Sequence, residues 1–274
     1  MIEIPEAVTL ASQVNASLAD KLIQHVTAAA SPHKFAWYYG DPAEYPARLT
    51  GEVLLSAQAL GGTLEVKTTR ATLTFSDGVN LRYREPGAPL PQKHQLLLQF
   101  NDGSSLAASV QMYGGLVCWP DSEVYDNPYY KAAKSKPSPL SKEFDRDYFH
   151  SLLAPEPVQK MSLKAALATE QRIPGLGNGV LQDILWHARF SPRKKVNTLT
   201  GPDESVLFDS LESTLAEMIR LGGRDTETDL FGTPGGYEVV MCAKNNAQPC
   251  PHCGTPIFKE AYMGGSVYYC RNCQ

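Results

Sequence analysis

Two Cys-x2-Cys motifs near the C-terminus constrain this chain more than any other feature of its sequence. Cys250 and Cys253 form the first motif, Cys270 and Cys273 form the second, and sixteen residues separate the two. Each motif offers two thiolates from one tight turn, and a hairpin between them closes a tetrahedral four-thiolate site. The spacing is typical of a zinc ribbon rather than of four unrelated buried cysteines. We therefore predict one bound Zn²⁺ ion.

The same motifs predict what the zinc does. Sulfur would fill all four coordination positions, so the ion is expected to be structural, with no open position for chemistry. Gly264-Gly265 is the predicted turn of the hairpin, with 267–269 on its return strand. His252 lies between two ligands and is not expected to bind the metal. Cys118 and Cys242 lack partners at ligand spacing and are expected to be inert.

Length and composition bound the rest of the chain. Its 274 residues suffice for roughly two domains and a small module. No apolar run approaches the roughly 20 residues that cross a bilayer, which excludes a transmembrane protein. Glu3 and Glu6 stand where a secretory signal would carry positive charge, so we expect a cytoplasmic protein. We also expect the protein to be a monomer.

The N-terminal half combines one helix with many short strands. Apolar residues at helical spacing predict a helix over 8–26. Strand-like runs follow, with turns expected at Gly61-Gly62, Asp77-Gly78 and Asp102-Gly103. Repeated strands between such turns predict an antiparallel β-sandwich or barrel.

The remaining residues are predicted to be helical and then to form the zinc module. The proline- and serine-rich stretch 134–140 cannot continue a strand and marks a linker. Helical periodicity then covers 144–153, 163–171, 180–188 and 205–221. The expected fold is α+β and multidomain, with a β-sandwich over 1–136, a helical domain over 137–238 and a zinc finger over 239–274.

The charge pattern gives two opposing indications about partners. A formal net charge of -4 argues against a polyanion. Arg189, Arg193, Lys194 and Lys195 nevertheless form a local basic cluster without an acid, which is either a solvated surface patch or part of a DNA-binding face.

The segment Pro174-Gly-Leu-Gly-Asn178 joins two predicted helices. Gly175 and Gly177 would let the backbone approach another surface closely, and Asn178 could cap the next helix and donate its amide. The exposed start of a helix binds phosphate readily, although an ordinary tight connection explains the glycines as well. Together with the basic cluster and the zinc hairpin, the loop favours double-stranded DNA as the partner.

Three segments, taken in order, resemble one known family. Residues 171–186 resemble the helix-two-turn-helix (H2TH) motif of the formamidopyrimidine-DNA glycosylase and endonuclease VIII family. The stretch from Cys250 to Gln274 is similar to the zinc finger of that family, and Glu3-Ile-Pro-Glu6 to its opening motif. Between residues 30 and 135 the strand pattern and Lys93-His94 support the resemblance.

The resemblance implies a β-sandwich and a helical domain that hold bent duplex DNA with one nucleotide flipped out. The N-terminal amine in this family attacks C1′ of the damaged nucleoside and forms a Schiff base, while the adjacent glutamate, here Glu3, supplies the acid. Asn178 matches a phosphate-contacting asparagine. Gln111-Met112-Tyr113 matches side chains that fill the gap left by the flipped base, or else is an ordinary strand end. Residues 222–226 resemble a loop that covers that base, where Arg224 or Asp225 would touch it.

Three departures concern catalysis. Ile2 replaces the proline whose amine is the nucleophile in the family, and a large residue there normally prevents removal of Met1. Arg70 takes the place of a lysine on an early strand, and Gly265 takes the place of the arginine on the finger.

These observations predict a base-excision DNA glycosylase or abasic-site lyase, in which Glu3 and Ile2 carry the chemistry. Asn178, Gly177, Lys93, Gln111, Met112, Tyr113, Arg193 and Lys194 are expected to bind DNA. The alternative is a catalytically degenerate protein that binds lesions or DNA structures with the same clamp. A zinc module that binds RNA or protein is a third possibility, and a preference for single-stranded RNA would favour it.

Overall fold

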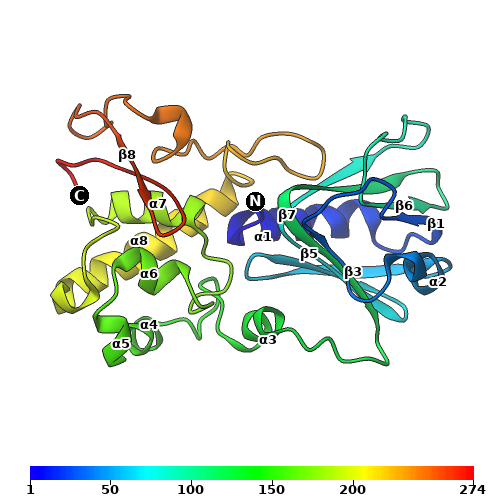
Figure 1. The fold of residues 1–274 in the computed structure, drawn as a ribbon, viewed down its shortest axis with the longest axis horizontal. Coiled ribbons are helices and arrows are strands. Elements are labelled where there is room, and N and C mark those ends of the chain that lie inside the picture. The colour runs from blue at the N-terminus through cyan, green and yellow to red at the C-terminus, as the bar shows by residue number, and fades with distance from the viewer.

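A computed structural model describes residues 1–274. The chain forms two lobes, with the sandwich on one side and the helices and the C-terminal hairpin on the other (Figure 1). Helix α1 (Ile4–Leu18) begins between the lobes and runs along the sandwich. The chain is therefore an α+β protein with an N-terminal antiparallel sheet and a C-terminal β-hairpin, as the sequence predicts.

The sandwich is one sheet that closes on itself. Its strands are β1 (Ile23–Ala28), β3 (Leu54–Leu60), β4 (Thr63–Thr68), β5 (Ala71–Arg84), β6 (Leu96–Phe100) and β7 (Ser105–Pro120), paired in the antiparallel order β1-β6-β7-β5-β4-β3. The short β2 (Ala36–Trp37) joins β7 in parallel, and α2 (Tyr45–Leu49) packs against β1. A bridge between Leu22 and Val53 brings the two ends of the path together around a core that α1 covers.

Helix α1 differs from the predicted 8–26. It begins earlier because Glu3 and Glu6 form a capping box at its start and Pro5 occupies its first turn. It ends at Leu18, and Asp20 takes a positive φ of 64° that turns the chain into β1. The apolar periodicity continues past Leu18, and no glycine or proline near that residue marks the helix end in the sequence.

The expected turn at Asp77-Gly78 is also wrong. Strand β5 continues through these residues, and the register of its pairing with β7 shifts between Asp77 and Val79. A β-bulge absorbs the left-handed φ of Asp77 (59°), as bulges commonly do. The turns at Gly61-Gly62 and Asp102-Gly103 are confirmed between paired strands.

The helical lobe contains α4 (Arg146–Leu153), α5 (Glu156–Gln159), α6 (Leu163–Ala168), α7 (Asn178–His187) and α8 (Gly201–Arg220). Helix α3 (Pro128–Ser135) precedes this lobe and lies against the sandwich, where it contacts β3 and the Tyr130 hydroxyl donates to Glu65 of β4. The buried apolar residues of the helical lobe form a cluster separate from that of the sandwich, and Ile4 of α1 belongs to the helical cluster. The N-terminus is thus wedged between the two lobes.

The C-terminal hairpin consists of β8 (Phe258–Tyr262) and β9 (Gly265–Tyr269). Met263 and Gly264 form its two-residue loop with φ of 52° and 74°, so the turn lies one residue before the predicted Gly264-Gly265. A third small cluster packs the hairpin against Trp186 of α7. The domain limits at 136 and 238 stay a prediction.

None of the helices in this chain combines the length and the apolar character needed to cross a membrane.

Candidate metal site and nucleic-acid interface

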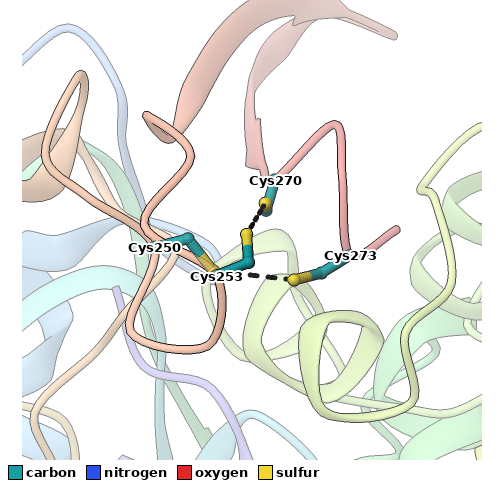
Figure 2. Close-up of side chains that lie close together, drawn as sticks. All are labelled: Cys250, Cys253, Cys270 and Cys273. Atoms are coloured by element: carbon teal, nitrogen blue, oxygen red, sulfur yellow. Dashed lines mark hydrogen bonds between the residues drawn. The ribbon is translucent and has the colours of Figure 1, made fainter.

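The four cysteines of the two motifs converge at one point. Figure 2 shows their side chains pointing toward one another, and their sulfur atoms all lie within 4.8 Å of one another. Four thiolates around Zn²⁺, each at a Zn–S distance of about 2.3 Å, would stand about 3.8 Å apart. The Cys253–Cys270 and Cys250–Cys273 sulfur distances of 3.4 and 3.9 Å fit this donor set. These residues could hold a zinc ion.

The two other cysteines lie outside this group. Cys118 is fully buried in the sandwich, and this burial raises the pKa of its thiol to about 12. Cys242 donates to the carbonyl of Val239. Neither sulfur is placed to bind the metal.

Several polar side chains dock the hairpin onto the helical lobe, and three of them bond to its backbone. The Asn178 amide donates to the Ser266 carbonyl (2.9 Å), and the Lys164 ammonium donates to the Tyr262 carbonyl (2.7 Å). Gln182 accepts from the backbone N–H of Tyr268. The finger and the start of α7 therefore form one surface. The H2TH and zinc motifs in the sequence do not indicate that these two parts contact each other.

The start of α7 is not an open phosphate site. Its Gly179 and Val180 N–H groups donate to the Glu3 carboxylate at 3.0 and 2.9 Å. Asn178 is the first helical residue and not the cap, which is Gly177. The free N–H groups and the positive end of the helix dipole thus hold a side chain of the protein.

The glycines of this loop are explained by packing within the protein. A Cβ on Gly177 would lie 2.5 Å from the Glu3 carboxyl carbon. A Cβ on Gly175, whose φ is +79°, would lie 1.9 Å from the backbone N of Gly62 in the β3–β4 turn. The close approach predicted for these glycines is therefore to the N-terminus and to the sandwich.

A buried charge network surrounds the start of α1. Arg224 is only 3% exposed and pairs with Glu6 through two hydrogen bonds of 2.7 and 2.9 Å, and its guanidinium lies 3.5 Å from Glu3. Burial raises the pKa of Glu3, against the opposing effect of Arg224. Burial alone would also raise the pKa of Glu6, but Arg224 reverses this and lowers it. Glu3 is thus the carboxyl more able to hold a proton.

Ile2, which stands where the family has its nucleophilic proline, is buried. Ile2 is 7% exposed, and its backbone N–H donates to the Asp77 carbonyl at 2.6 Å. The ammonium of Met1 pairs with Glu227. The Met1 carbonyl accepts from Arg224. The first three residues are therefore fixed in place.

Arg70 does not lie at this site, contrary to the match made for it. It is in the β4–β5 turn, where it pairs with Glu52 at 2.5 Å. The opposite end of β4 is the one beside the N-terminus, because a Cβ on Gly62 would lie 3.1 Å from the Ile2 carbonyl. The turn at this end of β4 is Gly61-Gly62, so no cationic side chain from it lies beside the N-terminus.

Gln111, Met112 and Tyr113 lie at the bulge of β7, facing that of β5. Met112 has a φ of 62° and is 73% exposed. The Tyr113 hydroxyl contacts the Met1 sulfur at 3.8 Å. The segment therefore projects beside the N-terminus, as a gap-filling role requires.

The expected basic residues are not all free. Arg193 pairs with Glu260 of the finger and stacks on Tyr262 at 4.0 Å, while Lys194 lies 3.9 Å from Asp203. The cluster contains no acid in sequence, but the fold supplies acids to it. Lys93 is exposed in the loop before β6.

The loop after α8 is tied to the sandwich. Arg82 donates to the Asp229 carbonyl and to the Thr228 hydroxyl, and the Leu230 side chain is fully buried in the sandwich core. Arg224, at the start of this loop, points into the carboxylate network. Asp225 accepts from Val239. The sequence carries no local signal for these contacts.

Known proteins share this sequence pattern and this fold. The family model for the formamidopyrimidine-DNA glycosylase H2TH domain matches residues 136–229. Formamidopyrimidine-DNA glycosylase of Lactobacillus delbrueckii subsp. bulgaricus is 27% identical over 100% of this chain and 99% of its own length. Residues 136–229 thus match an H2TH domain, and the whole chain is similar to formamidopyrimidine-DNA glycosylases. The relative from Geobacillus kaustophilus, 26% identical, is covered over its full length as well.

Solved structures of this family share the fold of the whole chain. The Lactococcus lactis Fpg in complex with DNA containing an abasic site has a TM-score of 0.84, with 24% identity over 99% of both chains. MutM (Fpg) from Thermus thermophilus has a TM-score of 0.81 and 22% identity, covering 99% of this chain and 98% of its own. Both lobes and the finger of this chain thus have counterparts in these structures.

Proposed function

We propose that this protein binds damaged or abasic duplex DNA and acts on it as a base-excision glycosylase or abasic-site lyase. The observation that carries the proposal is the position of Glu3. It is held by two N–H groups of the H2TH helix, directly after Ile2, in a chain that matches formamidopyrimidine-DNA glycosylases from end to end. Asn178 on the same helix contacts the finger, so one helix joins the acid to the predicted phosphate site.

In this reaction Glu3 would supply a proton as the sugar ring opens, a role for which the raised pKa is suitable. The amine that forms the Schiff base would come from the N-terminus; if Met1 is removed, Ile2 presents a primary amine beside Glu3. Zinc would be held by Cys250, Cys253, Cys270 and Cys273 and would supply structure alone.

A catalytically degenerate clamp is the second candidate, and two observations favour it. The Ile2 nitrogen donates to the Asp77 carbonyl, and Gly265 carries no cation at the finger. Such a protein would keep duplex binding and lose the covalent step.

Borohydride trapping on duplex DNA with an abasic site separates the two candidates. A glycosylase or lyase gives a covalent protein–DNA adduct whose yield falls in Glu3→Gln. The intact mass of the protein shows whether Met1 or Ile2 provides the amine. Tight binding without any adduct, at any pH, would leave the degenerate clamp as the function.

A further inference from the structure

An exposed aromatic patch lies beside the N-terminus on the sandwich. It consists of Phe35, Trp37, Met112 and Tyr113. The exposed fractions of Phe35, Trp37 and Met112 are 46%, 48% and 73%. Large apolar side chains gathered at one place on a surface commonly mark a binding site.

The patch is built rigidly from two segments far apart in the sequence. Strand β2 pairs with β7 through Ala36 and Trp37, and the Phe35 carbonyl accepts from Gly114 at 3.0 Å. The Trp37 and Tyr113 ring centroids are 5.6 Å apart, with their planes inclined by 38°. The pairing of β2 with β7 and the contact between the two rings therefore place Trp37 and Tyr113 side by side on the surface.

The chemistry of the patch suits a nucleobase. Open aromatic faces stack on bases of any sequence, and each such stack contributes on the order of 1–3 kcal/mol. The Lys34 ammonium lies 5.3 Å from the centre of the Phe35 ring and adds a cation where a phosphate backbone would pass. A lipid or an apolar peptide would not need this combination of flat rings and adjacent positive charge.

The patch is continuous with the candidate active site. Tyr113 contacts Met1, and Met112 protrudes from the same bulge. A nucleotide that enters the site at Glu3 leaves its partner base unpaired, and this patch offers that base an open aromatic surface beside the N-terminus.

We propose that Trp37, which packs against Tyr113, stacks on the nucleobase left unpaired opposite a damaged or abasic nucleotide. Trp37 is then a specificity-determining residue that recognises the opposite strand. This inference rests on the proposed function, since it needs a duplex bound with one nucleotide flipped out toward Glu3.

Fluorescence of Trp37 tests the stacking directly. The chain has three tryptophans, and the other two, Trp119 and Trp186, are each 5% exposed. Three duplexes would be titrated: one fully paired, one with tetrahydrofuran opposite adenine, and one with tetrahydrofuran in both strands. We expect quenching with the second duplex, little with the first or third, and none in Trp37→Phe.

Affinity measured by anisotropy provides the second readout. Trp37→Ala should weaken binding to the tetrahydrofuran–adenine duplex by roughly tenfold, which is a stack of about 1.4 kcal/mol, and Trp37→Phe should restore most of it. Leu55→Ala, which removes an exposed side chain of β3 outside the patch, should change nothing.

Equal quenching by all three duplexes, or tight binding without quenching, would overturn the assignment of Trp37. Absence of anisotropy binding to any abasic duplex would instead overturn the proposed function, and the inference with it. The two failures are thus distinguishable.

Discussion

Arg224 is the side chain on which the buried N-terminal carboxylates depend. In Arg224→Met, Glu3 and Glu6 lose their cation but stay buried, so the free energy of unfolding near neutral pH should fall by about 3–5 kcal/mol. Arg224→Lys keeps the charge without the paired hydrogen bonds and should lose less. Urea unfolding of the three proteins measures the difference. Equal stability of Met and Lys variants would show that the charge is not needed.

The pH dependence of the same variant follows from the pKa shifts. In the native protein the pKa of Glu6 is lowered, so its contribution is present above the unfolded pKa and is lost as the pH falls through the folded one. Without Arg224, burial raises the pKa of both carboxyls. The folded state then binds more protons, and Arg224→Met should gain stability as the pH falls from about 8 to about 5. Stability that falls over this range would contradict the assignment.

Asn178 tests the phosphate contact. Its amide group donates one N–H to the Ser266 carbonyl, and the second N–H of the same group could donate to a phosphate oxygen. Asn178→Ala should weaken binding to all duplexes alike, on the order of tenfold, because phosphate contacts do not read sequence. Asn245→Ala removes amide-to-carbonyl bonds to Val239 and Val240, which do not involve the start of α7 or the hairpin strands, and serves as the control. Selective loss on one lesion would speak against the phosphate contact.

At this scale the sequence predicts what is local. The cysteine motifs are confirmed as a cluster because each pair comes from a single turn. Glu3 and Gly179 are 176 residues apart, so no pattern in the chain could have shown that the acid occupies the start of α7. Arg70 was matched by charge and strand order, yet it lies at the other end of β4 from the site.

At the scale of elements, most helices and strands follow from periodicity, and the errors lie at irregular positions. Asp-Gly favours a turn, but in β5 the long pairing with β7 outweighs this preference and converts the turn into a bulge. The bulge matters because it faces Gln111, Met112 and Tyr113.

Gly78 is the position at which the bulge can be tested. A Cβ there would lie 2.0 Å from the Gln111 carbonyl, so Gly78→Ala must displace the β7 bulge and should destabilise the sandwich by about 1–3 kcal/mol. Gly201→Ala, where nothing lies within 4 Å, is the control. Thermal unfolding and affinity for abasic duplex measure both effects. Unchanged binding by a folded Gly78→Ala protein would show that the shape of the bulge does not matter for DNA.

For the molecule as a whole, the sequence indicates the order of its parts but not how they are joined. The loop after α8 buries Leu230 in the sandwich, and α1 contributes Ile4 to the helical core. Each lobe thus contributes an apolar side chain to the core of the other, and these contacts hold the two lobes together. Apolar periodicity does not reveal such contacts, because the residues that make them are far apart in the sequence.

Loss of the metal tests whether the finger and the helical lobe act as one surface. Cys250→Ser, or removal of zinc by a chelator, withdraws a contribution on the order of 10 kcal/mol, so the hairpin should lose its protection from protease and hydrogen exchange. Lys164, Asn178 and Gln182 would then lose their partners on the hairpin, and duplex affinity should fall by more than in Asn178→Ala. The sandwich has its own core and should stay protected, which serves as the internal control. A finger that stays protected without metal would mean that its packing on Trp186, rather than the thiolate cluster, holds the interface together.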